Sequence, residues 1–309
     1  MRADPQLQSC VSCPRHCRVN RYKKSGFCGL RAELLISHIG LHHGEEPPIS
    51  GTKGSGTIFF SGCNLRCVFC QNFQISQAFQ QGVPGALTTR RLSREELVDE
   101  IFHLQEMGAH NINLVSPSHI LPQLTATLRL AKNNGLNIPV VYNSNGYDSV
   151  TALKNMRGLV DIYLPDIKYR GNDLGRRYSG VPDYGDIIPG VLAEMLSQVG
   201  LLQTDENGIA RRGLLVRHLV LPGHLTNSRE CLRLLKNLSS DITLSIMSQY
   251  APCHLAHEFP EINRPLTPAE YDEITDYALD LGLEHAFVQD MSSQGCLMPD
   301  FNQPQPFTS

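Results

Sequence analysis

The sequence contains no long hydrophobic segment and carries little net charge. No apolar run approaches the ~20 residues that span a bilayer, so we expect no membrane span. The amino terminus, MRADPQLQSC, lacks the apolar core of a signal peptide, and we therefore expect a cytoplasmic protein. The formal net charge is only −3, so the chain as a whole offers no basic surface for nucleic acid, although a local patch can still form.

Length and composition instead fit a globular protein. Hydrophobic residues make up 41% of the 309 residues, enough for a large core, and charged residues make up 18%. The length exceeds the usual size of one domain, but a single α/β barrel also fits it.

The ten cysteines need an explanation other than disulfide bonds, because the cytosol keeps thiols reduced. Most of them fall into two tight groups in the first quarter of the chain, as the ligands of metal sites do. The groups are Cys10, Cys13, Cys17 and Cys28, and then Cys63, Cys67 and Cys70. Cys231, Cys253 and Cys296 stand alone, and we interpret them as core or surface thiols.

From residue 57 onward, short apolar segments alternate with amphipathic ones. A capping box at Ser93-x-x-Glu96 predicts the start of one helix, and a cap with proline in the first turn, Thr267-Pro268-x-Glu270, predicts the start of another. The expected strands begin at Thr57, Ile112, Pro139, Val160, Leu214, Ile242 and His285. Buried strands that alternate with helices indicate parallel βαβ units. We therefore predict an α/β fold, a partial or complete (β/α) barrel of parallel strands.

The segment before this alternation has a different character. Residues 1–50 are rich in cysteine and basic side chains, show no regular pattern and end in EEPPISG, a boundary marked by proline and glycine. We therefore divide the chain into a small Cys-rich amino-terminal metal-binding segment, residues 1–50, and a barrel domain, residues 51–309.

The second cysteine group directly follows the first expected strand of the barrel, in the sequence SGCNLRCVFCQN. In barrels and open α/β sheets the chemistry lies beyond the carboxyl ends of the strands, so this loop has the position of an active site. A structural zinc ion requires four ligands, and no fourth Cys or His follows at a suitable spacing. Three thiolates can hold a four-iron cluster and leave one iron open to a small ligand. The alternative is half of a zinc site that a distant residue completes.

The spacing C-x3-C-x2-C, with an aromatic residue before the last cysteine and a strand before the first, resembles the radical S-adenosylmethionine (SAM) superfamily. The resemblance implies that Cys63, Cys67 and Cys70 bind a [4Fe-4S] cluster whose open iron is chelated by SAM. It also implies that one electron from the reduced cluster cleaves a carbon–sulfur bond of SAM, which gives methionine and a 5′-deoxyadenosyl radical.

The resemblance extends over most of the chain. The sequence resembles the branch of this superfamily that is related to pyruvate formate-lyase-activating enzyme. The segments that carry it are FFSGCNLRCVFCQNFQIS, NINLVSPSH, VVYNSNGY, VDIYLPDIKY and RGLLVRHLVLPGH. It implies that Phe69 packs near the adenine of SAM and that Asp166 and Lys168 lie near its methionyl group. It places Arg217 and Leu219 near the ribose and adenine. The glycine-rich SAM-contacting stretch of that family is not present, and SPSH takes its place.

The residues themselves support part of this assignment. Asp166 and Lys168 share one face of a strand, since side chains two apart point the same way. Such a pair can be a surface ion pair, but its place at the carboxyl end of a buried strand favours a function. Arg217 interrupts an apolar strand, and a buried cation needs a carboxylate or a ligand as its partner.

The first cysteine group reads CVSCPRHCRVNRYKKSGFCG. Four cysteines at this density predict a closed four-thiolate site that holds zinc or a second iron–sulfur cluster. The alternative is four unligated thiols in a basic arm. We favour a second iron–sulfur cluster, because an electron must reach the SAM site and such a cluster could relay it.

Three classes of function remain. The first is a radical SAM oxidoreductase of the activating-enzyme type, which abstracts a hydrogen atom from a protein or peptide and takes electrons from a partner such as flavodoxin or ferredoxin. The second is a radical SAM enzyme that acts on a small molecule or RNA, although the net charge argues against RNA. The third is a non-catalytic zinc-binding interaction module. An iron count and a SAM-cleavage assay separate the third class from the first two.

Overall fold

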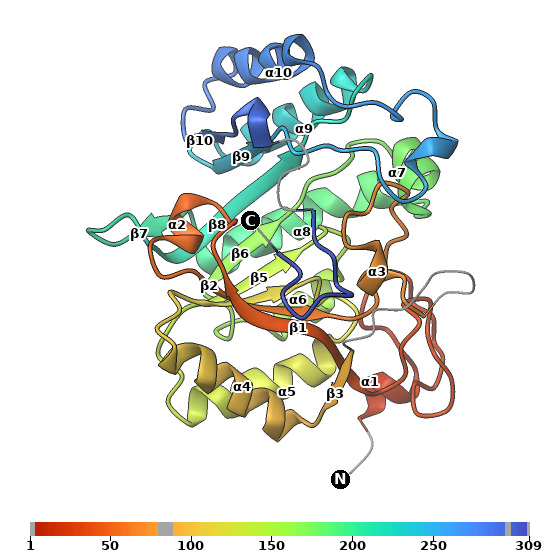
Figure 1. Cartoon of the computed structure of the whole chain (residues 1–309), viewed down its shortest axis with the longest axis vertical. Coiled ribbons are helices and arrows are strands. Elements are labelled where there is room, and N and C mark those ends of the chain that lie inside the picture. Colours follow the sequence, from red (N-terminus) through yellow and green to blue (C-terminus); the bar gives the residue numbers. More distant parts are fainter. Residues whose placement is uncertain (1–3, 80–88, 294–297, 308–309) are drawn as a thin grey trace.

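The computed structural model describes residues 4–79, 89–293 and 298–307. A sheet of mainly parallel strands runs through the centre of the molecule, with helices around it (Figure 1). The strands are β1 (Leu34–His42), β2 (Ser55–Phe60), β3 (Arg90–Leu92), β4 (Ile112–Val115), β5 (Val140–Ser144), β6 (Ile162–Pro165), β7 (Gln203–Thr204), β8 (Ala210–Leu219), β9 (Thr243–Met247) and β10 (Ala286–Val288). The α-helices are α1 (Pro5–Gln8), α2 (Pro47–Ser50), α3 (Phe73–Ser76), α4 (Arg94–Glu106), α5 (Leu121–Asn133), α6 (Val150–Lys154), α7 (Asn172–Ser179), α8 (Tyr184–Val199), α9 (Leu225–Leu238) and α10 (Pro268–Asp280).

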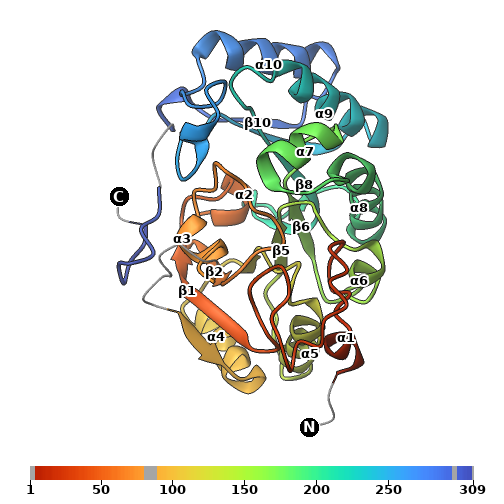
Figure 2. The ribbon, with the colours of Figure 1, turned by 90° about the vertical axis from the view of Figure 1, so that its right-hand side faces the viewer.

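The strand order makes the sheet an open, partial barrel. Neighbouring strands follow the order β10-β9-β8-β6-β5-β4-β2-β1-β3, and all pairs from β10 to β2 are parallel. Within the described residues β3 and β10 are the two edges and do not pair with each other, so the barrel is not closed. The helices from α4 to α10 cover the outer face of the curved sheet (Figure 2). The predicted α/β fold is therefore confirmed, in its partial-barrel form.

Local sequence signals account for most of these elements. Every strand expected from Thr57 onward is present, with bounds that differ by a few residues. At the start of α4, the backbone N–H of Glu96 donates to the Ser93 hydroxyl and the Glu96 carboxylate accepts from the Ser93 N–H. Thr267 and Glu270 form the same capping box at α10. These caps satisfy backbone N–H groups that a helix start leaves unpaired.

The amino-terminal segment is more regular than its sequence pattern indicates. The expectation that residues 1–50 are irregular is wrong for Leu34–His42, which forms β1 and pairs antiparallel with both β2 and β3. Its sequence, LLISHIGLH, mixes apolar residues with two histidines and a glycine and lacks a clean alternation. The strand is ordered by partners distant in the chain, which a local pattern does not reveal. The division at residue 50 into two domains stays a prediction, although the sheet itself begins at Leu34.

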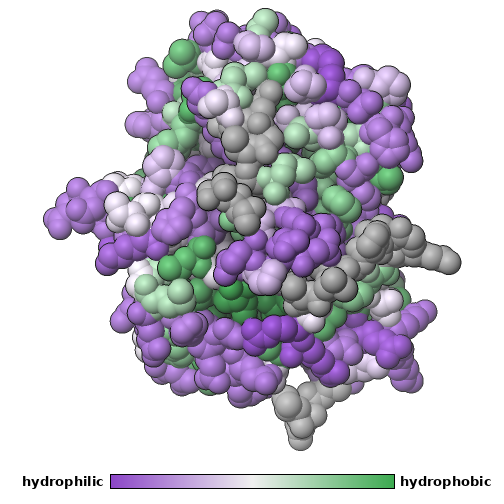
Figure 3. Space-filling model, viewed as in Figure 1, coloured by the Kyte–Doolittle hydropathy of each residue, from purple (hydrophilic) through white to green (hydrophobic). Residues whose placement is uncertain are grey.

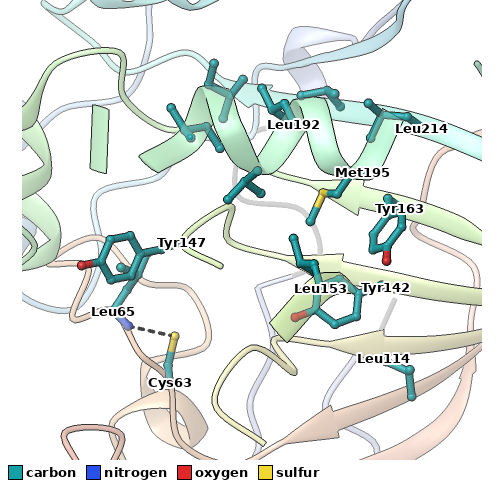
Figure 4. Close-up of a cluster of buried hydrophobic side chains, with 14 of the residues drawn as sticks. Cys63, Leu65, Leu114, Tyr142, Tyr147, Leu153, Tyr163, Leu192, Met195 and Leu214 are labelled. Atoms are coloured by element: carbon teal, nitrogen blue, oxygen red, sulfur yellow. Dashed lines mark hydrogen bonds between the residues drawn. The ribbon is translucent and has the colours of Figure 1, made fainter. Parts of the chain in front are cut away.

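Side chains on the outer side of the sheet pack beneath the helices. Tyr142 of β5 and Tyr163 of β6 lie next to Leu153, Leu192 and Met195 from α6 and α8 (Figure 4). All five side chains are fully buried. This packing fixes the curvature of the sheet against its helical layer.

A second, smaller core lies on the inner side of the barrel. Strand residues alternate between the two sides, so the neighbours of the outer core residues point inward. Ile49 of α2 packs into this inner core, whose other buried members are Val141, Ile162, Leu164, Ala210 and Leu215. The short helix α2 therefore fills part of the barrel interior rather than covering its outside.

The surface agrees with an interior that holds most of the apolar side chains. Figure 3 shows hydrophilic residues over most of the face seen in Figure 1, with a band of hydrophobic residues in its lower half. In the part of the chain that the structure describes, the helices are too short or too polar to span a membrane.

The inner core predicts that α2 contributes strongly to stability. Ile49→Ala leaves a cavity against β5, β6 and β8, and we expect the free energy of unfolding to fall by about 2–5 kcal/mol. Chemical denaturation of anaerobically prepared protein measures this. Leu279→Ala on α10 is the control, because Leu279 is 64% exposed and its loss should change stability by no more than about 0.5 kcal/mol. Equal effects of both substitutions would show that α2 does not anchor the barrel.

Candidate functional site

The cysteine loop leaves the carboxyl end of β2 and is held in place by backbone hydrogen bonds. The N–H of Gly62 donates to Ile75, that of Arg66 to Ser179 and that of Val68 to Tyr178. Gly62 has a φ of 77°, and any side chain there would place its Cβ 2.6 Å from the carbonyl oxygen of Cys28. The glycine therefore allows both the turn of the loop and its close approach to the first cysteine group.

Each thiol of this loop is hydrogen bonded. The amide of Asn145 donates to Cys63 Sγ at 3.3 Å, and the N–H of Leu65 donates to the same sulfur at 3.4 Å (Figure 4). Cys67 Sγ lies 3.0 Å from the hydroxyl of Ser179, and Cys70 Sγ lies 3.3 Å from that of Ser76. N–H groups directed at Cys63, and hydroxyl groups beside Cys67 and Cys70 that can donate to their sulfurs, form the kind of hydrogen bonds that tune iron-bound thiolates.

The same thiols are poor nucleophiles without a metal. Burial raises the pKa of Cys63 to about 11 and that of Cys70 to about 12. Burial also raises the pKa of Cys67, although the ammonium of Lys168 partly offsets it. A cation must therefore stabilise the thiolates. Three buried thiols with sulfur-directed donors fit a [4Fe-4S] cluster with one open iron.

A cavity of about 480 Å³ lies next to this loop, inside the barrel. The eight residues that the sequence assigns to the cluster and to SAM all line it. They are Cys63, Cys67, Phe69, Cys70, Asp166, Lys168, Arg217 and Leu219. The fold thus brings together residues that are spread over more than half of the chain. The four amino-terminal cysteines are not among its lining residues.

Asp166 and Lys168 follow β6 and form an ion pair of 2.6 Å. Burial lowers the pKa of Lys168, but Asp166 and the nearby Cys67 sulfur outweigh it, so the net pKa lies above its usual value. The Tyr184 hydroxyl accepts from the Lys168 N–H and donates to the backbone oxygen of Asp166. Gly146 permits this arrangement, since a Cβ there would lie 2.3 Å from that same oxygen. The pair is thus partly buried and faces the cavity, and it is not a surface ion pair.

Arg217 of β8 is paired with two carboxylates from the segment before α2. Its Nε donates to Glu46 Oε1 at 2.7 Å, and its Nη2 donates to Glu46 Oε2 at 2.5 Å and also to Glu45. The Asn113 amide donates to the second oxygen of Glu45 at 2.9 Å. The side chains of Glu45 and Glu46 are 8% and 5% exposed. Arg217 thus has the carboxylate partners that a buried cation needs.

The two remaining predicted SAM contacts, Phe69 and Leu219, also line the cavity. Phe69 is buried, and its ring centroid is 5.8 Å from that of Tyr250. Leu219 is partly buried and, two residues after Arg217, points to the same side of β8. Both present apolar surface to the cavity.

Several cavity residues escaped the sequence analysis. Glu45 and Glu46 belong to EEPPISG, which we interpreted only as a boundary, although two adjacent carboxylates before prolines are a signal for a charged partner. Asn143 and Asn145 lie at the end of β5, in the segment VVYNSNGY, to which we assigned no role in the site. Ser116, in the SPSH segment, lines the cavity with a φ of 57°, a conformation that favours glycine.

The four cysteines of the first group lie close to one another. Cys13 is within electrostatic range of Cys10, Cys17 and Cys28, and a Cβ added at Gly26 would lie 3.6 Å from Cys17 Sγ and 3.8 Å from Cys28 Sγ. Cys10, Cys13 and Cys28 are buried. Among the described residues, no set of three or more His, Cys, Asp or Glu side chains is placed to hold a single metal ion.

The single cysteines have ordinary surroundings. Cys231 is fully buried in the outer core. Cys253 is half-buried, and its thiol donates to the backbone oxygen of Phe69 at 3.4 Å. Cys296 lies outside the described residues.

The pairing of Arg217 predicts a pH-dependent stability defect. Burial raises the pKa of Glu46, but Arg217 outweighs it and the net pKa is low. Arg217→Met removes the main contribution that lowers the pKa of Glu46 and leaves the two carboxylates buried without a cation. We expect the unfolding free energy to fall by about 3–5 kcal/mol near pH 7.5.

The loss should shrink as the pH approaches about 5, because in the variant the folded state then binds protons more tightly than the unfolded state does. Urea denaturation at both pH values measures this. Arg211→Met on the same strand removes only an exposed pair with Asp205 and should cost no more than about 1 kcal/mol at either pH. A pH-independent loss in Arg217→Met would contradict the assignment.

Comparison with known proteins identifies the family. The family model of the radical SAM superfamily matches residues 57–193, which include the cysteine loop and the Asp166–Lys168 pair. A curated relative, the uncharacterized protein MJ0674 of Methanocaldococcus jannaschii, is 36% identical over 275 residues, which are 88% of this chain and 75% of the relative. MJ0808 of the same organism is 23% identical over 300 residues, 92% of this chain and 82% of that protein.

Two solved structures are also similar. SuiB from Streptococcus suis has a TM-score of 0.48 and 10% identity, covering 74% of this chain and 47% of SuiB. The FeFe-hydrogenase maturase HydG from Carboxydothermus hydrogenoformans has a TM-score of 0.47 and 17% identity, covering 73% and 50%. The chain spans about half the length of these two structures. With the family match and the curated relative, the chain belongs to the radical SAM superfamily, whose members use an iron–sulfur cluster and SAM.

Proposed function

We propose that the protein is a radical SAM oxidoreductase of the activating-enzyme type, which cleaves SAM reductively and abstracts a hydrogen atom from a protein or peptide. One observation carries the proposal. Cys63, Cys67 and Cys70 face the same cavity as the Asp166–Lys168 pair, at the carboxyl ends of β2 and β6. In this family of folds the chemistry takes place at that edge of the sheet.

The thiolates of Cys63, Cys67 and Cys70 would hold three irons of a [4Fe-4S] cluster, and SAM on the fourth iron supplies the radical on one-electron reduction. The chain's other residues position SAM. Lys168 can donate to a carboxylate and Asp166 can accept from an amine, and their ion pair holds both groups in place. Phe69 supplies an apolar wall of the cavity for a planar base.

The size of the cavity supports a protein or peptide substrate. A pocket for one drug-sized ligand has a volume of about 300–1,000 Å³. The cavity here measures about 480 Å³, so a bound SAM leaves room for only a small part of a second molecule. A side chain or short loop that enters from outside fits this space better than a whole buried substrate does. A radical SAM enzyme that acts on a small molecule or RNA is the second candidate, and only an identified substrate separates the two.

The cysteine loop provides the first test of this function. Replacing Cys63, Cys67 and Cys70 together by alanine should remove about four irons per chain and abolish the formation of 5′-deoxyadenosine from SAM. Iron analysis and chromatography of the reaction products measure both results. Cys231→Ala in the core is the control and should leave both unchanged. Undiminished SAM cleavage in the triple variant would overturn the assignment.

The ion pair provides the second test. Lys168→Met keeps the length of the side chain and removes its charge, and we expect SAM affinity to weaken by about tenfold or more, the range of a lost hydrogen bond to a charged group. Lys132→Met is a matched control, because Lys132 pairs with Asp161 at 3.1 Å with similar partial burial, outside the cavity. Equilibrium binding and thermal unfolding of both variants separate the two roles. If Lys168→Met loses stability while binding SAM normally, the pair is structural.

A further inference from the structure

The first cysteine group sits in a small knob, residues 4–33, which we call the cysteine knob. Its sulfurs receive hydrogen bonds of the kind found around metal-bound thiolates. The N–H of Phe27 donates to Cys17 Sγ at 3.4 Å, and the Arg21 guanidinium donates to Cys10 Sγ at 3.6 Å. The same guanidinium donates to the backbone of Arg31 and of His119, so it joins the knob to the barrel.

Four thiols that lie together can hold either one zinc ion or a four-iron cluster. Four ligands of one zinc ion converge on one point, about 2.3 Å from each sulfur. In a four-iron cluster each thiolate binds a different iron, so the sulfurs stand farther apart. Neither cysteine group of the described chain is placed to hold a single ion, and one of these groups is the family's cluster loop. The placement of the thiols therefore does not separate a zinc ion from a cluster, and it is the direct contact of the knob with the cluster loop that favours a second cluster.

The knob and the cluster loop are in direct contact. The Cys28 carbonyl lies against Gly62, the residue before Cys63, so closely that no side chain fits between them. The Arg15 guanidinium donates to the backbone oxygen of Asn64 at 2.9 Å. Cys28, a ligand of the proposed knob cluster, is thus separated from Cys63, a ligand of the loop cluster, by a short stretch of backbone and one van der Waals contact.

An aromatic ring bridges the same two segments. The guanidinium of Arg15 lies 3.6 Å from the centroid of the Phe27 ring, and that of Arg66, from the cluster loop, lies 4.0 Å from it. These cation–π contacts fix the position of the residue next to Cys28 against the loop that carries Cys63 and Cys67.

The outer face of the knob is strongly basic, in contrast to the rest of the chain. Residues 4–33 contain six arginines and lysines against two acidic residues, a formal charge of +4 in a chain whose total is −3. The exposed cations are Arg18, Lys23, Lys24, Arg31 and, from the adjoining loop, Arg66. Val11 and Tyr22 are also exposed beside them. Figure 3 shows hydrophilic residues over this corner of the molecule, where Figure 1 draws α1.

We propose that the cysteine knob is the electron-entry port of the enzyme. Cys10, Cys13, Cys17 and Cys28 hold a second iron–sulfur cluster, and the basic face around it docks an acidic, low-potential one-electron donor protein of the flavodoxin or ferredoxin kind. In each transfer the donor loses one electron, which passes by way of the knob to the cluster at Cys63, Cys67 and Cys70. No bond is made or broken until that electron cleaves one SAM. This inference rests on the proposed function and adds to it the route of the electron.

Charge reversal tests the docking face in the complete enzyme. Lys23→Glu/Lys24→Glu changes two exposed side chains that form no hydrogen bond with a sulfur of the described residues, so the iron content should remain at about eight per chain. The rate at which photoreduced flavodoxin bleaches the iron–sulfur absorbance, measured without SAM at low salt, should fall about tenfold or more. The wild-type rate should fall in the same way as salt is added. Lys53→Glu/Arg233→Glu has the same change in charge away from the knob and should retain the wild-type rate.

A second variant tests the relay itself. Cys10→Ala/Cys13→Ala should retain about four irons, bind SAM and cleave it with photoreduced deazaflavin, a small reductant that needs no docking. Its reduction by flavodoxin should be slow. In the fully reduced wild type, magnetic coupling between the two clusters should broaden the electron paramagnetic resonance signal, and this broadening should vanish in the variant.

The outcomes separate the relay from the proposed function. An unchanged iron content in the cysteine variant, one bound zinc, or an unchanged flavodoxin rate in the Lys23/Lys24 variant would overturn the relay. Tight binding of an RNA oligonucleotide that the charge reversal abolishes, with normal reduction by flavodoxin, would also overturn it and would assign the basic face to RNA. If wild-type protein fails to cleave SAM even with deazaflavin, the proposed function itself is wrong.

Discussion

Arg217 is a cation inside a barrel, and its need for partners organises much of the molecule. A guanidinium removed from water is costly unless carboxylates pair with it. Here the carboxylates come from Glu45 and Glu46, more than 170 residues earlier in the chain. Because this pairing draws the segment before α2 into the barrel interior, Ile49 can pack against the inner faces of the central strands. The segment from residue 45 to residue 49 therefore brings both paired charges and a buried apolar side chain into the barrel interior.

The ion pairs of Arg217 with Glu45 and Glu46 form part of the wall of the cavity in which we propose that the chemistry takes place. The ion cluster of Arg217 and the three thiols of the cysteine loop both line the cavity. The backbone of Asp166 forms a bridge to Arg217, while its side chain pairs with Lys168. Charges of both signs are thus fixed before any ligand enters, so the site need not reorganise on binding.

The two cysteine groups lie in different surroundings, but the segments that carry them are in contact at one point. The cluster loop faces the cavity, whereas the knob faces solvent with an excess of positive charge. Gly62 is the residue that lets them meet, since any side chain there would collide with the Cys28 carbonyl. This contact connects the exposed basic face of the knob to the buried cysteine loop with little intervening structure.

The sequence by itself determined the alternation of strands and helices, since period-two and period-3.6 patterns and capping boxes are local properties. It also determined the position of the cysteine loop after the first parallel strand, because spacing and order along the chain suffice for that. Only the tertiary structure decided that Leu34–His42 forms a strand, that Glu45 and Glu46 pair with Arg217, and that the Cys28 carbonyl lies against Gly62. The physical reason is that each of these depends on partners distant in the chain, brought together by the folding of the whole sheet, and no local pattern encodes which distant group will satisfy a buried charge or a free strand edge.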